Sequence, residues 1–331
     1  HHEKCNQLFF VYDMPTIRSL QYSPLIEIHT LQITQLQMVL SVAESSYIYD
    51  SLASNKPTRP DSRKPNQFRP LKANCGFLPN SNGSSRIYNA DGIECISSVK
   101  AKVIRTDKTS DLINVEIDIF GEKDNTTLCQ HLTTLIKESL LDSFDFKCLK
   151  LTGKYYFQLY IDISILYLPE DFSISSYTLY SLLSLISMGV YVALKSTKLP
   201  LLVSERDDFE VEEEPTFSDD WEVSTDLIPR NGENTFQPAL VFVVGTAGNT
   251  VIIDPSLEEE QILEHGICLT WSNSDITTPV QSLTLSSVNT KALKPNLIVK
   301  AMDLVKNVAN EVVQALNTIA ETDAIDSDAI F

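Results

Sequence analysis

Basic side chains, the residue types that bind phosphate groups, gather in one proline-rich stretch, residues 56–72. Asp61 is its one acid, so the stretch has a net charge of +5 from six basic residues: Lys56, Arg59, Arg63, Lys64, Arg69 and Lys72. Its four prolines exclude a helix, which predicts an extended and partly exposed segment. Such a segment could contact a phosphate backbone or a partner protein.

Acidic side chains, which could bind a metal ion or transfer protons, concentrate in residues 205–226. This tract holds eleven acids and one base, Arg206, a net charge of −10 out of −18 for the whole chain. We interpret the tract as a solvated loop within a linker, residues 205–236. The alternative is that two of its acids are held together as a metal site.

The sulfur and imidazole side chains give no metal pattern. None of the six cysteines lies within four residues of another, so the chain has no C-x-x-C motif for zinc or redox chemistry. Of the five histidines only His1 and His2 are close in sequence. We therefore expect reduced, mostly buried thiols, no metal site and no cofactor.

Composition restricts the class of protein. The chain has 331 residues, 43% of them hydrophobic and 21% charged, as in soluble globular proteins. No apolar run reaches the roughly 18–20 residues that a membrane helix needs. The net charge of −18 argues against a protein that coats nucleic acid by bulk charge.

The hydrophobic periodicity indicates the elements that must position these side chains. A capping box, Ser41 to Glu44, predicts a helix start. Alternating residues predict strands at 93–104 and 112–119, which we interpret as a hairpin with opposite charges on its outer faces. Further strands and helices are expected at 84–89, 126–141, 155–165, 182–194, 239–244, 251–253, 267–271, 280–285 and 294–319.

This element order predicts an α+β fold of two lobes. Residues 1–37 show no period, and we expect them to be a non-native or disordered extension. The remaining boundaries are a first domain at 38–204, the acidic linker, a carboxy-terminal domain at 237–319 and an acidic tail at 320–331.

Several segments resemble the RNase PH-like ring subunits of the eukaryotic RNA exosome. The similarity extends from about residue 38 to 318 and is carried by Arg59–Arg63 (R-P-D-G-R in the family), Asn82–Arg86, Val99–Ala101, Ala193–Pro200 and Asp254–Glu260. Ser62 replaces the glycine of the first motif. The resemblance implies a ribosomal-S5-domain-2-like α+β lobe with a smaller carboxy-terminal lobe. Residues 1–37 lie outside the pattern, and 167–183 is longer than the usual turn; we read both as possible gene-model artefacts.

The resemblance also bears on catalysis. Active members carry arginines in the link after the V-x-A strand and in the loop before the next helix, and an aspartate pair after the long helix. The corresponding segments here, 104–108, 120–125 and 202–208, lack the arginine cluster and the aspartate strand pattern. Lysine does not replace the bidentate fork of arginine toward phosphate. We therefore expect no catalytic residue in this chain.

What remains is a structural role, as the family implies. The expected partners are other RNase PH-like ring subunits, with the mRNA transport regulator 3-like subunit as a neighbour, S1/KH cap subunits and RNA threaded through the ring; no membrane is involved. Candidate channel residues are Lys100, Lys102 and Lys123, whose alternative role is a solvated face paired with Glu116 and Asp118. The family implies a location in nucleus, nucleolus and cytoplasm. An active phosphorolytic 3′–5′ exoribonuclease, a hydrolase using the acidic cluster and an acidic interaction module unrelated to RNA stay open.

Overall fold

The computed structural model describes residues 40–106, 108–121, 126–167, 179–203, 215–229, 236–283, 292–321 and 329–330. Residues 37–331 group into one compact unit, and residues 1–36 group separately. The expected extension at 1–37, the candidate Lys123 and most of the 167–183 insertion lie outside the described residues, so these three interpretations stay predictions. No helix in the described segments is long and apolar enough to cross a membrane.

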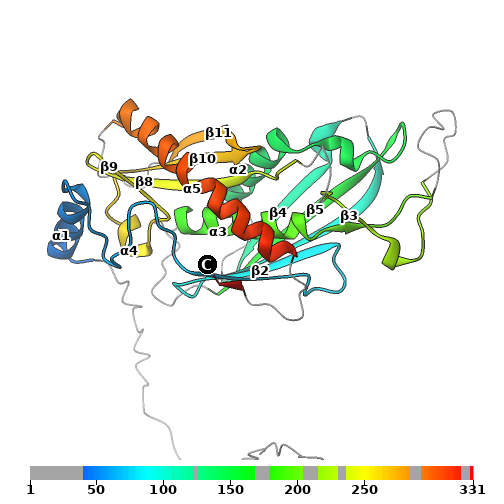
Figure 1. Ribbon diagram of the computed structural model, residues 1–331, viewed down its shortest axis with the longest axis horizontal. Coiled ribbons are helices and arrows are strands. Elements are labelled where there is room, and N and C mark those ends of the chain that lie inside the picture. The colour runs from blue at the N-terminus through cyan, green and yellow to red at the C-terminus, as the bar shows by residue number, and fades with distance from the viewer. Residues whose placement is uncertain are drawn as a thin grey trace, which may run out of the picture. The chain divides into compact units, whose positions relative to one another are not determined.

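The larger of two main sheets has the strand order β12-β1-β2-β3-β5-β4 (Figure 1). Its strands are β1 (Leu71–Cys75), β2 (Gly83–Asn89), β3 (Glu94–Arg105), β4 (Ile113–Ile119), β5 (Tyr155–Tyr167) and β12 (Ala329–Ile330). Buried and more exposed residues alternate along β4 and β5, so one face of the sheet belongs to the core and the other stays partly open.

The predicted hairpin of β3 and β4 is wrong. Strand β5 lies between them, antiparallel to β3 and parallel to β4. Helix α2 (Thr127–Ser143) lies in the connection from β4 to β5, and a parallel pair needs such a long crossover. The alternating pattern identified both strands, but alternation alone does not say which strands are neighbours.

The smaller sheet has the order β11-β10-β8-β9. Its strands are β8 (Leu240–Ala247), β9 (Thr250–Ile253), β10 (His265–Ser272) and β11 (Asp275–Leu283). All eight residues of β8 and of β10 are buried. These two strands are therefore covered on both faces, which explains their continuous apolar runs.

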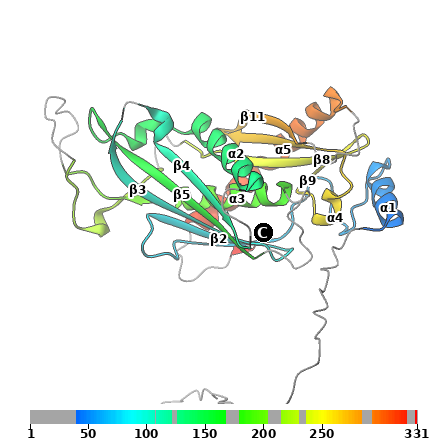
Figure 2. The same ribbon diagram turned by 180° about the vertical axis from the view of Figure 1, so that it is seen from behind.

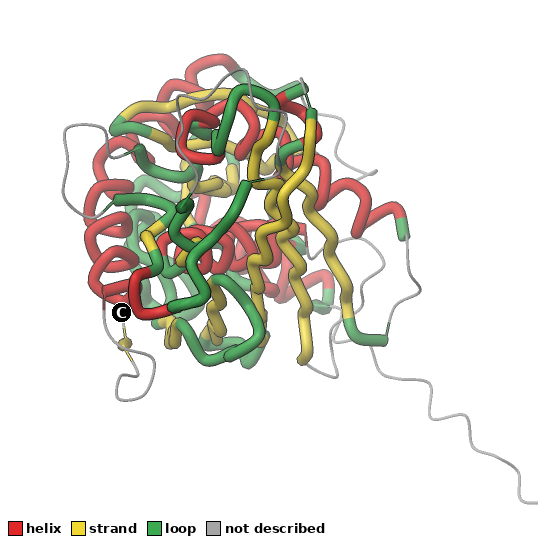
Figure 3. Tube along the Cα trace, turned by 90° about the vertical axis from the view of Figure 1, so that its right-hand side faces the viewer, coloured by secondary structure: helices red, strands yellow, loops and turns green. Residues whose placement is uncertain are grey.

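Helix α3 (Leu179–Lys195) separates the two sheets (Figures 1 and 3): it packs on β2 and β3 of the larger sheet and on β8 of the smaller one. Residues 182–194 of this helix are all buried, and most of their side chains are apolar, as expected for a helix covered on every side. Gly189 permits the close approach, since a Cβ there would lie 2.9 Å from Ser97 Oγ. The glycine at this position thus allows α3 to pack closely on β3.

The other helices surround this centre (Figure 2). Helix α2 packs on β4 and β11, and α5 (Pro295–Glu321) packs on α3, β9 and β10. Helix α1 (Val42–Ala53) begins at the predicted capping box of Ser41 and Glu44. The single-turn helix α4 (Leu257–Glu260) has a second capping box, between Ser256 and Glu259.

The second half of the acidic tract is ordered as part of a small ribbon. Strands β6 (Lys198–Leu199) and β7 (Thr225–Asp226) pair, and two backbone hydrogen bonds of 2.9 Å extend the pairing: Val203 N to Thr216 O, and Ser218 N to Leu201 O. The first half, residues 204–214, lies outside the described residues. The tract is therefore not a featureless loop throughout, although the expected domain boundaries stay predictions. The α+β fold class is confirmed.

Candidate functional site

The candidates Lys100 and Lys102 lie on the open face of the larger sheet. Both side chains are exposed on β3, while the alternate residue Ser97 faces Gly189 of α3. Their cross-strand neighbours on β5 are Tyr160 and Gln158. Lys102 Nζ lies 4.4 Å above the Tyr160 ring, a cation–π contact that holds the lysine over the middle of this face.

The alternative role of these lysines, pairing with acids of β4, does not occur among the described residues. Glu116 and Asp118 are aligned with Asp162 and Ser164 of β5, on the far side of that strand from Lys100. The open face therefore has a basic side on β3 and an acidic side on β4. A basic side of this kind can contact an anionic chain without neutralising the charge of the whole protein.

The two loops in which the family carries phosphate-binding arginines start at opposite ends of β5. The link after β3 begins beside Tyr155, where Arg105 pairs with β5, whereas the loop after β4 begins beside Ile165. Ten residues of strand at about 3.3 Å each separate these positions by about 33 Å. A single phosphate ion, held by contacts of about 3 Å, cannot bridge these two positions.

The third expected segment, after β6, lies at the same end of β5 as the first link. Phe217, which pairs with Leu202, packs against Phe157 near the start of β5, with ring centroids 5.5 Å apart. Among the described residues of β3, β6 and the ribbon, Arg105 is the one arginine at this end. No group of three or more Asp, Glu, His or Cys side chains in the described segments is arranged to hold a metal ion.

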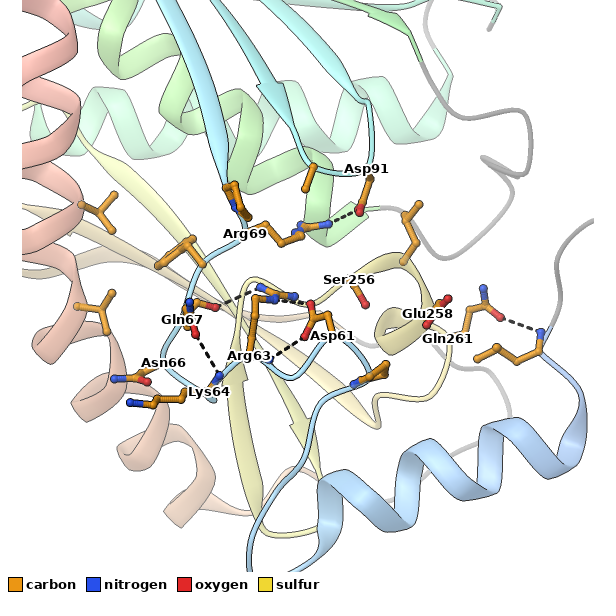
Figure 4. Close-up of a pocket in the computed structure, with 18 of the residues that line it drawn as sticks. Asp61, Arg63, Lys64, Asn66, Gln67, Arg69, Asp91, Ser256, Glu258 and Gln261 are labelled. Atoms are coloured by element: carbon orange, nitrogen blue, oxygen red, sulfur yellow. Dashed lines mark hydrogen bonds and ion pairs between the residues drawn. The ribbon is translucent and has the colours of Figure 1, made fainter. Parts of the chain in front are cut away.

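A large hollow in the described structure lies elsewhere, between residues 60–70, α4, α5 and the β2–β3 turn. It is a cleft of about 1420 Å³, and Figure 4 shows Arg63, Arg69, Asp61 and Asp91 lining it. Two arginines of the basic stretch, Arg63 and Arg69, line this cleft. Both are buried, and so is Arg59. The stretch is partly exposed, as expected, but among its basic side chains only the lysines are exposed.

Arg59 and Glu259 form the deepest ion pair, with both side chains fully buried. Arg59 donates from Nε to Glu259 Oε1 at 2.7 Å and from Nη2 to Oε2 at 2.6 Å, a bidentate arrangement. It also donates to the backbone oxygens of Ile253 and Asp254, at 2.9 and 2.8 Å. The guanidinium thus ties the basic stretch to the end of β9 and the start of α4.

Asp254 receives the other two arginines. Arg69 donates from Nη2 to Oδ1 at 2.6 Å and from Nε to Oδ2 at 3.0 Å, and Arg63 donates from Nη1 to Oδ2 at 3.1 Å. Burial opposes ionisation of Asp254, but the charge and hydrogen bonds of Arg69 and the charge of Arg63 outweigh it and lower its pKa. Arg69 also pairs with Asp91 of the β2–β3 turn, and Arg63 with Asp61.

This charge network is structural. Its arginines are already bound to carboxylates of the same chain, so they do not form a phosphate site, and they link residues 59–69 to a segment almost 200 positions away. Sequence inspection missed the pairing, although it identified both partners: the basic Arg59–Arg63 motif and the acidic Asp254–Glu260 motif. Their opposite charges were the available signal.

Comparisons with known proteins agree on one family. Residues 67–200 match the 3′ exoribonuclease family (RNase PH), domain 1. The chain is 40% identical over 284 residues to the exosome complex component RRP42 of Saccharomyces cerevisiae, covering 85% of this chain and 100% of that protein. It is 26% identical over 243 residues to the corresponding component of Schizosaccharomyces pombe, covering 69% and 76% of the two chains.

Solved structures show the same fold. A chain of an archaeal exosome core and one of the Archaeoglobus fulgidus exosome with RNA bound to its active site each superpose with a TM-score of 0.57 at 17% identity, covering 82% of this chain and 95% and 96% of theirs. Rice (Oryza sativa) Rrp46 superposes with a TM-score of 0.52 at 15% identity, covering 80% and 100%.

Proposed function

The chain belongs to the RNase PH-like subunits of the eukaryotic exosome, and from this premise we propose that it is a non-catalytic structural subunit of the exosome core ring. The observation that carries the proposal is the 40% identity along the entire length of yeast RRP42. In this role it supports 3′–5′ RNA processing and decay, including rRNA maturation and mRNA turnover, and helps to line the RNA channel.

The placement of arginine supports the absence of catalysis. The chain has eight arginines, and three of them are committed to the buried network at Asp254 and Glu259. Arg86 pairs with Glu94 at 2.6 Å on the sheet. Phosphorolysis must hold a phosphate ion beside an RNA phosphodiester, and this repulsion has to be offset by preorganised cations. Among the described residues this leaves Arg105, and one arginine does not provide such a cluster.

A phosphorolysis assay tests this part of the proposal. The purified chain is incubated with a 3′-tailed RNA, inorganic phosphate and Mg²⁺ or Mn²⁺, and nucleoside diphosphates are measured. We expect no release, and no change in RNA decay by the assembled complex when Asp220 or Glu222 is replaced by its amide. Phosphate-dependent release that is lost on Arg105→Ala would instead identify an active phosphorolytic enzyme.

The basic side of the open sheet face is the proposed RNA contact. Lys100 and Lys102 are exposed, and Lys102 is held over Tyr160, so a passing phosphate backbone meets two positive charges. Charge reversal, Lys100→Glu with Lys102→Glu, should leave ring assembly intact and reduce protection of RNA by the assembled ring. The salt dependence of binding should fall by about 0.7–0.9 units of slope for each lost phosphate contact.

A matched control is Lys306→Glu on α5. This lysine is also exposed and lies 3.7 Å from Asp275 on the smaller sheet, away from the proposed contact. RNA protection equal in the control and in the β3 double variant would assign Lys100 and Lys102 to an ordinary solvated surface. Lys123 is proposed for the same role from its place in the sequence.

The partners follow from ring membership. We expect direct contact with other RNase PH-like subunits, among them the mRNA transport regulator 3-like subunit, and with S1/KH cap subunits, in nucleus, nucleolus and cytoplasm. Purification from native lysate under mild salt, followed by native mass spectrometry, should return a stoichiometric set of exosome subunits. Recovery of the chain without them would favour an acidic interaction module unrelated to RNA.

A further inference from the structure

Exposed apolar side chains concentrate on the ribbon formed by residues 198–203 and 215–226. Four of the large apolar side chains that remain exposed in the described structure belong to it: Leu201, Val203, Trp221 and Val223. Single exposed apolar residues are common on protein surfaces, but a group of them on one small element marks an interaction site. Trp221 is 52% exposed, and tryptophan is among the residues most enriched at the centres of interfaces.

The pairing of the ribbon explains why this face points away from the core. Leu202 and Phe217 form an isolated bridge, and Phe217 packs against Phe157 of β5. Because successive side chains of an extended strand alternate, Leu201 and Val203 must lie on the face opposite to Leu202. The inner face of the ribbon is therefore filled by its own core contact. Leu201 and Val203 on the outer face stay exposed, and so do Trp221 and Val223 in the 3₁₀ turn (Trp221–Val223) that precedes β7.

Charge restricts what can cover this face. Asp219, Asp220 and Glu222 are exposed beside Trp221. An RNA backbone or an acidic protein surface would be repelled, whereas lysine and arginine side chains would be attracted.

We propose that the outer face of the ribbon docks a lysine- or arginine-rich segment of a neighbouring exosome subunit, with Trp221 as its apolar anchor. That the segment comes from an exosome subunit rests on the proposed function. The basic and apolar chemistry of the segment is inferred from the ribbon alone. An apolar centre rimmed by charges of one sign is the pattern of a protein–protein interface, in which the apolar anchor contributes affinity and the rim selects the partner.

Cross-linking within the assembled complex tests the partner. A photoreactive benzoylphenylalanine replaces Trp221 in the chain purified with its partners, and the cross-linked peptide is identified by mass spectrometry. We expect a peptide from another subunit with an excess of Lys and Arg over Asp and Glu. The control places the same residue at Tyr47 on α1, an even more exposed aromatic position away from the ribbon. Cross-links to RNA, to an acidic peptide, or to nothing at position 221 would overturn the proposal.

Peptide binding to the isolated chain tests the chemistry without the complex. The chain has two tryptophans, and Trp271 is buried, so acrylamide quenching and a shift in fluorescence report on Trp221. A peptide of alternating Lys and Leu should protect Trp221, whereas Lys/Ser and Glu/Leu peptides should not.

The role of charge is tested with the double variant Asp219→Lys, Glu222→Lys. Asp220 is left unchanged because it accepts a hydrogen bond from the Glu222 backbone N–H at 3.0 Å. This variant should bind the Lys/Leu peptide about tenfold more weakly or worse. Equal binding by the variant, or by the Glu/Leu peptide, would overturn the docking chemistry. Absence of other exosome subunits from the purified material would refute the proposed function instead, while the peptide result would still stand.

Discussion

Replacing Asp254 by Asn should weaken the contact between the basic stretch and α4. The substitution keeps the shape of the side chain but removes the charge that Arg63 and Arg69 share. It also puts an NH₂ group where one carboxylate oxygen accepts, and Arg69 is donating to both oxygens. Both arginines are buried, so neither recovers its hydration in place.

The size of the effect follows from this burial. Removing one partner of a buried, hydrogen-bonded ion pair costs about 3–5 kcal/mol, most of it from the charge left unpaired. At 1.36 kcal/mol per factor of ten, that loss corresponds to a roughly 100- to 5000-fold rise in the opening equilibrium. The opening should involve residues 59–70 and 251–260 together, because Ile253 N also donates to Pro65 O at 2.9 Å.

Hydrogen exchange followed by mass spectrometry measures this opening in the assembled protein. Peptides from residues 59–70 and 251–260 should lose protection, while β3 and β5 should exchange as in the wild type. The pKa of Asp254 is lowered in the folded state, so its stabilising contribution is complete above the unfolded pKa of about 3.9 and disappears as the pH falls through the folded value. The difference between wild type and variant in the free energy of opening should therefore be constant at pH 6–8 and shrink below about pH 4.

The Arg86–Glu94 pair provides the control. It is also close, at 2.6 Å, but Arg86 is 39% exposed and lies on the sheet surface. Glu94→Gln should cost at most about 1 kcal/mol. If Asp254→Asn and Glu94→Gln changed exchange to the same extent, the buried network would not be holding these segments together, and the reasoning from burial would be refuted.

Three further predictions follow from local geometry and are checked by urea unfolding of the purified protein. Glu259→Gln should lower the free energy of unfolding by about 3–5 kcal/mol. Arg59→Met combined with Glu259→Met should restore most of this loss, because no buried charge is then unpaired. A double variant less stable than the single variant would contradict this. Ser62 has a φ of 61°, in the left-handed region that a β-branched residue disfavours. Ser62→Val should therefore lower the free energy of unfolding by about 1–2 kcal/mol, and Ser62→Gly should not lower it. Equal effects of the two substitutions would show that the backbone relaxes. Gly83→Ala should cost about 1–3 kcal/mol because its Cβ would lie 2.5 Å from Ala193 O and 2.8 Å from Thr197 Cα, and an unchanged midpoint would mean that α3 shifts.

Features set by neighbours in the sequence were predictable. The capping box at Ser41 joins residues three positions apart, and it begins a helix as expected. The alternation in β5 and the apolar run of α3 reflect the environment of each element, so their type followed from pattern alone. The family resemblance added the fold and the structural role, because the motifs occur in the family's order and spacing.

Features set by contacts between distant residues were not predictable in this way. Alternation revealed β3 and β4 but not that β5 lies between them, because strand order is decided by crossover geometry and by what α2 and α3 must cover. The basic stretch likewise looked like a binding surface, since a run of charges has the same sequence whether it faces water or carboxylates. Only the tertiary structure brings Arg59, Arg63 and Arg69 to Asp254 and Glu259, about 190 positions away, where exclusion of water turns a charged segment into part of the core.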